Sequence, residues 1–449
     1  MTYRNWIDKD LRYNWHPYTQ MKDCETDPPI LIDRAKGIKL YDAKGNFYYD
    51  TISSWWCNVH GHNHPKIKEA IKRQLDSLDH VLFAGFTHKS AILLAEKLVS
   101  IAPQGLTKVF FSDNGSTSVE TALKISLQYW RNIGRKKKIK FVSLDHGYHG
   151  DTIGAMSIGG VDLFNRIFSP LFFKSFKVPS PYCYRCPMGK QSSSCQIDCI
   201  NLLEDLLEKK NSEIAAVILE PLVMAAGGMI IYPKEYLQKA ADLTKKYNVH
   251  LILDEVATGF GRTGKMFACE YANTNPDFMC LSKGITSGTL PLAATLTTEK
   301  IYRSFYAEYN QKKTFYHGHT YTANPISCAA ALESLRIFEN EGTLVRVGRL
   351  SKLFHHSLER FEALSVVGDI RKIGMIGALE LVKDRKSGRP YGFKERIGYK
   401  IYREGLKTHV ILRPLGNIIY LFLPLCVKEN EINYISDNLY KILKKCDFS

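Results

Sequence analysis

The sequence predicts an α/β protein: a large domain with a mostly parallel central sheet, and a smaller α+β domain. Apolar runs that stop abruptly at an acid or a lysine are typical of buried parallel strands whose carboxyl ends open into a crevice. Such runs alternate with helical stretches between residues 108 and 296. About one hundred residues at the C-terminal end mix strands and helices less regularly, which favours a second domain.

The composition is that of a globular enzyme. The chain has 449 residues, of which 45% are hydrophobic and 24% charged, and 61 basic against 45 acidic residues give a net charge of +16. The basic run Arg135–Lys138 follows a helix-like segment, and we interpret it as a solvated helix end and loop. The other charges are dispersed, so we expect no nucleic-acid partner.

Targeting signals are not evident. No stretch approaches about 18 consecutive apolar residues, the length typical of a membrane span, so we expect no membrane segment. The N-terminus is polar and aromatic and lacks the apolar core of a signal peptide. Eleven cysteines without such a signal indicate reduced thiols in a cytoplasmic protein.

The N-terminal arm carries HPYTQ at 16–20 and a predicted hairpin over residues 30–50. Histidines then alternate at positions 60, 62 and 64, a spacing that could suggest metal. No carboxylate or cysteine stands at ligand spacing, and Gly61 and Pro65 indicate a tight turn, so we expect no metal there.

The segment KVFFSDNGSTSVETALKISLQYW indicates a strand, a glycine turn and a helix. Apolar residues recur at helical spacing after Val119, and Thr117 with Glu120 has the form of a capping box. The turn places backbone N–H groups of Gly115 and Ser116 at a helix N-terminus, which suits a cofactor phosphate. A plain capped helix is the alternative.

Two further strand ends carry polar residues. FVSLDHGYHGDT brings Tyr148, His149 and Asp151 after a strand, where the tyrosine either stacks on a cofactor ring or is simply packed. IAAVILEP ends an apolar strand at Glu220.

The stretch 250–284 contains the strongest chemical signal. Two apolar runs end at Asp254 and, through Ser282, at Lys283, so both side chains are expected at the carboxyl edge of the sheet, where open α/β sheets bind ligands. Such a lysine can form a Schiff base with an aldehyde cofactor, and an aspartate can keep the pyridine nitrogen of pyridoxal phosphate protonated. A buried acid and a solvated lysine are the alternative interpretation.

Two motifs invite other interpretations. GFGRTG at 259–264 fits a dinucleotide loop and, with GKM, nearly a phosphate loop, but two carboxylates lie just upstream and no periodic helix follows, so we reject both. A cysteine-rich insert follows residue 180, and its four cysteines either bind zinc or belong to a surface loop: Cys183, Cys186, Cys195 and Cys199.

Together the motifs resemble the class III, pyridoxal-phosphate-dependent aminotransferases of fold type I, over nearly the whole chain. The residues that carry the resemblance are WHPYTQM, SSWWCNVHGHNHP, SDNGSTSVETALK, HGYHGDT, LDEVATGFGRTG and LSKGIT. The first two motifs point to the branch of the family that serves biotin synthesis.

The resemblance implies a role for each matching residue. Lys283 carries the cofactor and moves the proton, Asp254 pairs with the ring nitrogen, and Tyr148 stacks on the ring. Gly115 and Ser116 hold the phosphate, joined by Thr320 from the neighbouring subunit. The implied substrate-binding residues are Tyr18 (also counted as catalytic), Trp55, Trp56, Arg262, Gly318 and Arg413, whose guanidinium binds the distant carboxylate.

The resemblance also implies partners. It implies 7-keto-8-aminopelargonate as the acceptor, S-adenosylmethionine or lysine as the donor, and a homodimer with shared active sites. Another ω-amino acid:2-oxo acid transfer and a non-catalytic binding protein of this fold are the alternatives. His319, Leu415 and the cysteine insert depart from the best-known pattern, which leaves the donor open.

The expected division is 1–64, an N-terminal arm and part of the small domain; 65–335, a large cofactor-binding domain; and 336–449, a C-terminal small domain.

Overall fold

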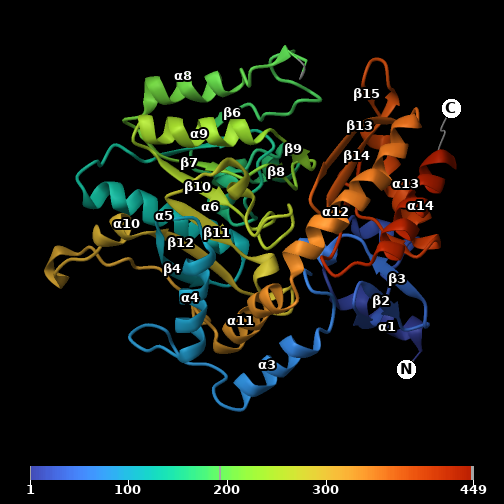
Figure 1. Cartoon of the computed structure of the whole chain (residues 1–449), viewed down its shortest axis with the longest axis horizontal. Coiled ribbons are helices and arrows are strands. Elements are labelled where there is room, and N and C mark those ends of the chain that lie inside the picture. Colours follow the sequence, from blue (N-terminus) through green and yellow to red (C-terminus); the bar gives the residue numbers. More distant parts are fainter. Residues whose placement is uncertain (1, 192–193, 446–449) are drawn as a thin grey trace.

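A computed structural model describes residues 2–191 and 194–445 (Figure 1). A seven-stranded sheet forms the centre of the described chain. All neighbouring pairs are parallel except those made by β12, which runs antiparallel to both β11 and β4. The order across the sheet is β4 (Leu106–Ser112), β12 (Ala293–Thr298), β11 (Phe278–Leu281), β10 (His250–Asp254), β7 (Ile214–Leu219), β5 (Lys140–Leu144) and β6 (Phe176–Val178). The predicted α/β class with a mostly parallel sheet is confirmed.

Both faces of this sheet are buried, because successive side chains of a strand point to opposite faces. Ile252 belongs to the apolar core beneath α5, whereas Leu251 and Leu253 belong to the core that contains α8 and α9. The continuous apolar runs of the sequence reflect this two-sided burial. The covering helices are α4 (Lys89–Ile101), α5 (Gly115–Asn132), α6 (Ile153–Ile158), α8 (Ile200–Lys210), α9 (Lys234–Lys246), α10 (Glu299–Arg303) and α11 (Pro325–Asn340).

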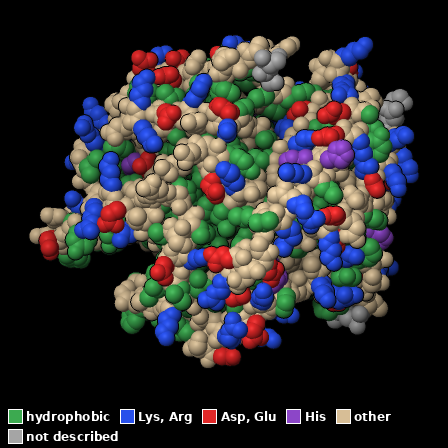
Figure 2. Space-filling model, in the orientation of Figure 1, with side chains coloured by type: hydrophobic (Ala, Val, Ile, Leu, Met, Phe, Trp, Pro, Cys, Tyr) green, Lys and Arg blue, Asp and Glu red, His purple; other side chains and the backbone are tan. Residues whose placement is uncertain are grey.

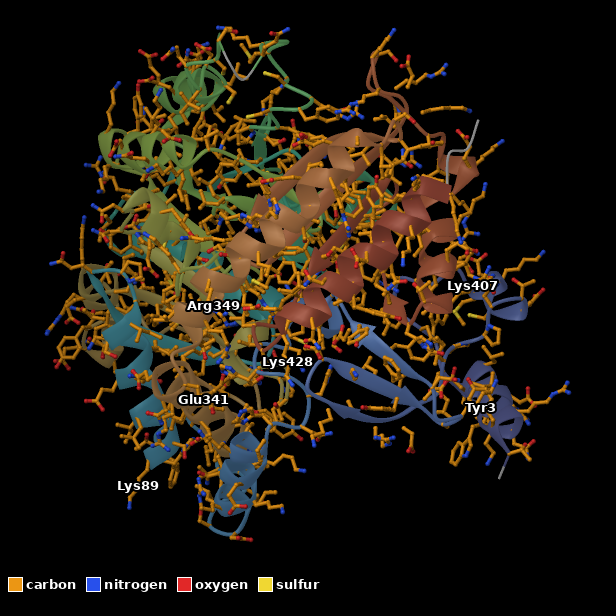
Figure 3. The ribbon with its side chains drawn as sticks, turned by 45° about the vertical axis from the view of Figure 1, so that its right-hand side comes forward. Tyr3, Lys89, Glu341, Arg349, Lys407 and Lys428 are labelled. Atoms are coloured by element: carbon orange, nitrogen blue, oxygen red, sulfur yellow. The ribbon has the colours of Figure 1, made fainter. Side chains whose placement is uncertain are left out.

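The two ends of the chain build the remaining part together. The predicted hairpin is a three-stranded antiparallel ribbon whose last strand pairs in parallel with β16, so the ribbon lies beside the C-terminal helices (Figures 1 and 3). Its strands are β1 (Ile32–Lys36), β2 (Lys39–Asp42), β3 (Phe47–Asp50) and β16 (Val410–Ile411). A second sheet and three helices complete this part: β13 (Val367–Ile373), β14 (Ile376–Asp384), β15 (Arg389–Pro390), β17 (Ile418–Phe422), α12 (Thr343–Glu359), α13 (Ile397–Lys407) and α14 (Glu429–Lys445).

Short elements join these parts. They are α1 (Tyr3–Tyr13), α2 (Ser53–Trp56), α3 (Pro65–Leu75), α7 (Asp162–Asn165), β8 (Val223–Met224) and β9 (Ile230–Ile231). In the described ranges, no helix combines the length and apolar character needed to cross a bilayer. Figure 2 shows basic side chains interspersed with acidic ones over the visible face.

One local prediction was wrong in part. Residues 135–137 of the basic run are exposed as expected, but Lys138 is 6% exposed and its ammonium donates to three backbone carbonyls, those of Asn211, Ile214 and Asn248. It also lies 4.5 Å from the centre of the Trp130 ring. Burial lowers its pKa to about 8.

Candidate active site

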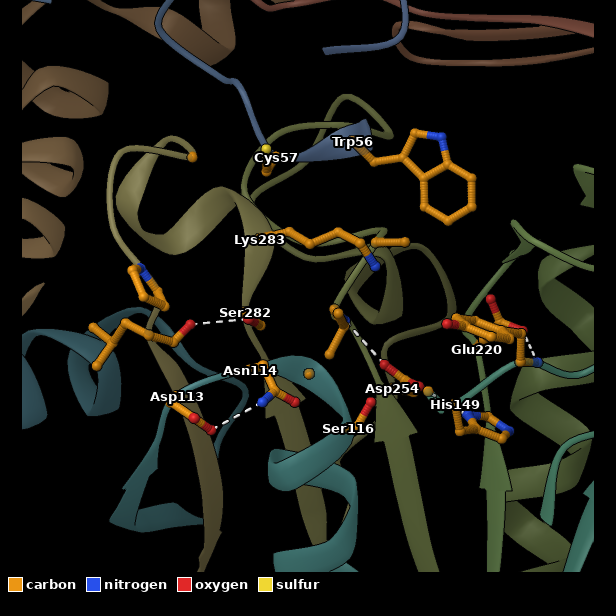
Figure 4. A pocket seen from close by; sticks show the side chains of 18 of the residues that line it. Trp56, Cys57, Asp113, Asn114, Ser116, His149, Glu220, Asp254, Ser282 and Lys283 are labelled. Atoms are coloured by element: carbon orange, nitrogen blue, oxygen red, sulfur yellow. Dashed lines mark hydrogen bonds and ion pairs between the residues drawn. The ribbon is translucent and has the colours of Figure 1, made fainter. Parts of the chain in front are cut away.

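A cavity of about 490 Å³ opens at the carboxyl edge of the central sheet. It lies where parallel strands of an α/β sheet place the residues that follow them. β4, β5, β7, β10 and β11 each deliver polar side chains to it, and α2 closes it from the other side (Figure 4). Its lining includes Trp56, Cys57, Asp113, Asn114, Gly115, Ser116, Tyr148, His149, Glu220, Asp254, Ser282 and Lys283.

Lys283 follows β11 and extends into this cavity between Trp56 on one side and Asp254 and Ser116 on the other (Figure 4). Its Nζ lies 5.1 Å from the centre of the Trp56 ring. Desolvation lowers the pKa of the amine, while the negative charges of Asp254 and Glu220 oppose that shift. A larger share of neutral, nucleophilic amine follows.

Asp254 ends β10 and is 5% exposed. One carboxylate oxygen lies 2.8 Å from Nδ1 of the buried His149, and the other accepts the backbone N–H of Val256 at 3.1 Å. These contacts fix the carboxylate at the bottom of the cavity. The sequence predicted that Asp254 and Lys283 lie at the same edge of the sheet. In the structure both side chains line one cavity at that edge.

Two residues to which the sequence analysis assigned no role, His149 and Glu220, lie beside this pair. His149 supports Asp254, and Glu220 accepts the backbone N–H groups of Tyr148 at 2.9 Å and Ala225 at 3.0 Å. Burial raises the pKa of Glu220 to about 7, and the nearby His149 lowers it in part. Glu220, like Asp254, stands at the end of an apolar strand in the sequence. That pattern was the sequence feature from which a role for Glu220 in the site could have been predicted.

The N-terminus of α5 supplies an anion site at the cavity wall. Gly115 and Ser116 begin this helix, so their N–H groups have no partner within the helix. A Cβ on Gly115 would lie 2.7 Å from a methyl carbon of Val256, so the close approach requires glycine. The predicted capping box was wrong by one turn: Asn114 is the N-cap, and it exchanges hydrogen bonds with Thr117.

Glu120 has a different task. Its carboxylate accepts the Thr152 hydroxyl at 2.6 Å and the Ala155 N–H at 3.2 Å, and so fixes the loop after β5. That loop passes over Ser116: a Cβ on Gly150, whose φ is +119°, would stand 1.9 Å from the Ser116 Oγ.

These residues fit pyridoxal phosphate by their chemistry. A desolvated lysine, a buried carboxylate and a helix N-terminus suit its aldehyde, its ring nitrogen and its phosphate respectively. Tyr148, also in the lining, is available to the ring.

An aromatic group forms the outer rim of the site. The Tyr18 ring meets the edges of Trp55 and Phe164, with centroids 5.5 and 5.2 Å apart, and its hydroxyl donates to Asp151 at 2.7 Å. Burial raises the pKa of Tyr18 to about 12. The Arg413 guanidinium lies 4.7 Å from the centre of the Trp55 ring and donates to the Tyr18 carbonyl at 3.3 Å.

Arg413 has no carboxylate partner within 4 Å among the described residues. A guanidinium held over an aromatic face without a counter-ion is suited to a carboxylate brought by a ligand.

Arg262 is not among the residues that line the cavity, and the substrate-binding role that the resemblance implied stays a prediction. Its side chain is 1% exposed, and four of its five N–H groups donate to protein acceptors. Those acceptors are the Ser53 hydroxyl and the carbonyls of Leu423, Trp56 and Asn58, at 3.0, 3.0, 3.2 and 2.6 Å. A motif match identifies the residue type but gives no information on burial.

The acceptors of Arg262 surround a left-handed turn. Ser53, Ser54, Trp55 and Trp56 have φ values of 50°, 45°, 72° and 74°. A left-handed backbone costs an L-residue roughly 1–2 kcal/mol, so four in succession cost on the order of 4–8 kcal/mol. Such strain persists only where the surroundings enforce it.

The segment that contains Gly318 and Thr320 lies outside this cavity. Both residues are exposed, and neither belongs to the lining. Its neighbour His319 comes within 4.0 Å of Asp113, so the segment passes near the rim of its own site.

The cysteine insert and the three histidines show no metal geometry in the described part of the chain, which omits residues 192–193 of the insert. No group of three or more histidine, cysteine or acidic side chains there could hold a metal ion. The four cysteines have free thiols. His62 contacts Asp50 at 2.8 Å, and His60 contacts the Ser334 carbonyl at 2.9 Å.

Comparisons with known proteins agree with this chemistry. The chain matches the family model for aminotransferase class-III over residues 21–443. It is 46% identical to an adenosylmethionine-8-amino-7-oxononanoate aminotransferase from Geobacter sulfurreducens, over 98% of this chain and 97% of that one.

Solved structures give the same result. The crystal structure of an enzyme with the same name from Methanocaldococcus jannaschii matches with a TM-score of 0.94 and 44% identity, over 99% of this chain and all of that chain. An omega transaminase from Pseudomonas jessenii, solved with PMP, matches with a TM-score of 0.92 and 32% identity, over 98% and 97% of the two chains.

Proposed function

Because the chain belongs to the class-III aminotransferases, we propose that it transfers an amino group to 7-keto-8-aminopelargonate and produces 7,8-diaminopelargonate. It is a pyridoxal-phosphate-dependent aminotransferase of fold type I. Relatives named for this reaction match at about 45% identity over nearly the full length, which supports the substrate assignment. The observation that carries the proposal is the combination of Lys283 and Asp254 in one cavity with an unpaired Arg413 at its rim.

The residues of this chain divide the work. Pyridoxal phosphate, when bound, supplies an electron sink for the charge left on a substrate carbon after its proton is removed. Lys283 would carry the cofactor and move that proton, since its amine is desolvated and reaches the centre of the cavity. Asp254 would keep the ring nitrogen protonated, and His149 holds the carboxylate in place.

The remaining positions follow from charge and shape. N–H groups of Gly115 and Ser116 would bind the phosphate, and Tyr148 would lie against the ring, placed by the contact of its N–H with Glu220. Arg413 would grip the distant carboxylate with two hydrogen bonds, while Trp55 and Tyr18 shape the channel between.

We propose S-adenosylmethionine as the amino donor, with lysine as the alternative. The rim offers aromatic faces, the Arg413 cation and the Asp151 carboxylate, a set that accommodates the charged groups of either donor. The donor screen below decides between them.

We further propose a homodimer with shared sites in the cytoplasm, and the division of domains given by the sequence. Thr320 and Gly318 would complete the site of the partner subunit, which is consistent with their exposure outside their own cavity. Large aromatic side chains are exposed in the same region, as an interface requires. They are Tyr302, Tyr306, Tyr309, Tyr316 and Tyr321. Sedimentation at several protein concentrations tests the dimer.

The test of function is a two-step assay. The pyridoxal form is mixed with S-adenosylmethionine or lysine, and loss of the visible cofactor absorbance identifies the donor. The resulting amino form is then mixed with 7-keto-8-aminopelargonate, which should restore the absorbance, and steady-state kinetics should be ping-pong. Restoration by 2-oxo acids but not by the keto acid would assign the enzyme to the ω-amino acid transaminases instead.

A further inference from the structure

Arg371, on β13, is a buried cation that joins two parts of the molecule. Its side chain belongs to the sheet of β13, β14, β15 and β17, and it reaches the segment between β8 and β9 (Figure 1). It is 7% exposed and donates to two carbonyls of that segment, those of Gly228 at 3.0 Å and Met229 at 2.9 Å. One of its terminal nitrogens also contacts Asp369 at 2.6 Å and Glu380 at 2.8 Å. One guanidinium therefore binds both its own sheet and the backbone of a distant segment.

The cysteine insert fixes the direction of this guanidinium. Tyr182, near the start of the insert, donates its hydroxyl to Glu380, and the centre of its ring lies 5.3 Å from the guanidinium carbon of Arg371. Arg185 donates to the other carboxylate oxygen of Glu380 at 2.6 Å. Glu380 is 4% exposed, so its carboxylate is buried between two guanidinium groups and a hydroxyl. Such a cluster holds its geometry, because the loss of one member leaves a buried charge without its partner.

The segment between β8 and β9 leads from Arg371 to the cavity. The Met229 N–H donates to the Ala225 carbonyl at 2.9 Å, which closes the segment into a turn. The Ala225 N–H donates to one oxygen of Glu220 at 3.0 Å, and the other oxygen accepts the Tyr148 N–H at 2.9 Å. Both Glu220 and Tyr148 line the cavity, and Figure 4 shows Glu220 at its wall. A chain of hydrogen bonds therefore connects Arg371 with the backbone of Tyr148.

The packing of the backbone supports the same connection. A Cβ on Gly227 would lie 2.0 Å from the His146 carbonyl oxygen, so the segment packs directly on the backbone two residues before Tyr148. His146 itself has a φ of 65°, which is uncommon for a residue other than glycine and persists where the surroundings enforce it. Its ring meets the Tyr182 ring edge-on, with centroids 6.3 Å apart. A displacement of the segment would therefore change the direction in which the loop after β5 presents Tyr148.

We propose that Arg371 is a positioning residue: acting through the segment between β8 and β9 and through the Glu220 carboxylate, it sets the position of Tyr148 in the cavity. Arg371 itself is not among the residues that line the cavity. The insert acts one step further away, because its tyrosine and arginine hold the carboxylate that binds Arg371. The inference rests on the proposed placing of Tyr148 against the cofactor ring, and it gives the C-terminal sheet and the cysteine insert a part in cofactor binding.

The first measurement needs neither cofactor nor substrate. Arg371→Lys keeps a positive charge beside Glu380, but one ammonium cannot replace a planar guanidinium that binds two carbonyls and two carboxylates at once. In the cofactor-free protein, hydrogen exchange is followed by peptide mass spectrometry. The peptides that contain the Tyr148 and Ala225 amides should exchange roughly tenfold faster in the variant, because local opening becomes easier. Peptides from β10 and β11 should exchange at their wild-type rates.

Lys138→Met is the matched control. Lys138 is also a buried cation that binds backbone carbonyls, and it lies at the opposite end of β5 from Tyr148. Its loss should lower the free energy of unfolding of the whole chain, because three carbonyls lose a donor. The exchange of the Tyr148 and Ala225 peptides relative to those of β10 and β11 should stay as in the wild type.

The second measurement tests the route through Tyr148 with pyridoxal phosphate alone. The cofactor-free protein is titrated with pyridoxal phosphate, and its visible absorbance and circular dichroism are recorded. In Arg371→Lys the apparent dissociation constant should rise roughly tenfold, about the contribution of one aromatic contact, and the visible circular dichroism should weaken. In the Tyr148→Ala background the same substitution should have no further effect, because a residue that acts through a ring cannot act once that ring is removed.

A milder variant covers the case in which Arg371→Lys does not fold. Tyr182→Phe removes only the hydroxyl that contacts Arg371 and donates to Glu380, and it keeps the ring against His146. It should give the same two changes in weaker form: faster exchange of the Tyr148 peptide and a higher dissociation constant for pyridoxal phosphate. Wild-type values for both would count against the proposal.

The outcomes are distinct. Wild-type exchange of the Tyr148 and Ala225 peptides in Arg371→Lys, or an equal acceleration in Lys138→Met, would overturn the proposal. A loss of cofactor affinity that persists in the Tyr148→Ala background would overturn it as well, because Arg371 would then act by another route. If the chain does not use 7-keto-8-aminopelargonate, the proposed function fails, yet both measurements still test Arg371, since neither contains a substrate.

Discussion

Glu220→Gln is expected to flatten the pH dependence of stability in the cofactor-free protein. Glu220 is 5% exposed, and burial raises the pKa of its carboxyl from 4.5 to about 7. Between these values the folded protein keeps a proton that the unfolded chain has released. Stability from this group is therefore fully present below about pH 4.5 and is lost as pH rises through about 7.

The magnitude follows from the size of the shift. One pKa unit corresponds to about 1.4 kcal/mol, so the whole window lowers the free energy of unfolding by about 3 kcal/mol. Roughly 2 kcal/mol of that falls between about pH 5 and about pH 7.5. Glutamine does not titrate in this range. The variant also loses one acceptor for a backbone N–H, but that loss lowers the free energy of unfolding by a similar amount at every pH. The slope of the free energy of unfolding against pH therefore reports the titration of the carboxyl alone.

The assay is urea unfolding of both proteins at several pH values and one fixed chain concentration, because association alone changes apparent stability. Glu255 is also buried with its pKa raised to about 7, but it is present in both proteins and cancels. Glu208→Gln, at an exposed glutamate, is the control for the substitution itself. Parallel pH curves for the wild type and Glu220→Gln would refute the reasoning.

Three other predictions concern the proposed chemistry. Lys283→Ala should reduce transamination to background, and borohydride reduction of the wild type should leave the cofactor on the peptide that contains Lys283; label on another lysine would contradict this role. Asp254→Asn should lower the rate of the amino-donor half-reaction by about 10²–10³-fold, the equivalent of removing one partner of a buried pair, measured by stopped-flow absorbance. An unchanged rate would exclude the charge as a requirement. Arg413→Ala should raise the KM for 7-keto-8-aminopelargonate about 10–100-fold, as expected from the loss of charge-assisted hydrogen bonds, in steady-state assays; an equal effect on an amine without a carboxylate would argue against direct contact.

The sequence was most informative where chemistry coincides with a strand end. Each of three residues, Asp254, Glu220 and Lys283, stands at or just after the end of an apolar run. The rule that parallel strands place their carboxyl ends at one edge of the sheet therefore predicts that these residues lie together. The N-terminus of α5 was found for the same reason, because a glycine turn between strand and helix has few other geometries.

Side-chain burial could not be inferred in this way. Arg262 and Lys138 were assigned to substrate and solvent, yet both bind backbone carbonyls inside the protein. Their acceptors come from segments far away in the chain, such as Leu423 and Asn248, which local patterns do not relate to them. The left-handed turn could not be predicted from the sequence either, because neither serine nor tryptophan favours a backbone with positive φ.

The pairing of β3 with β16 has a consequence for how the chain folds during translation. Thr51 donates its hydroxyl to the Ile411 carbonyl, 360 positions later. A ribosome adds about 5–20 residues per second, so these partners emerge roughly 20–70 s apart. The central sheet, whose strands lie between Leu106 and Thr298, is synthesised completely within that interval. The β3 edge of the amino-terminal ribbon therefore stays unpaired until Val410 and Ile411 have left the exit tunnel.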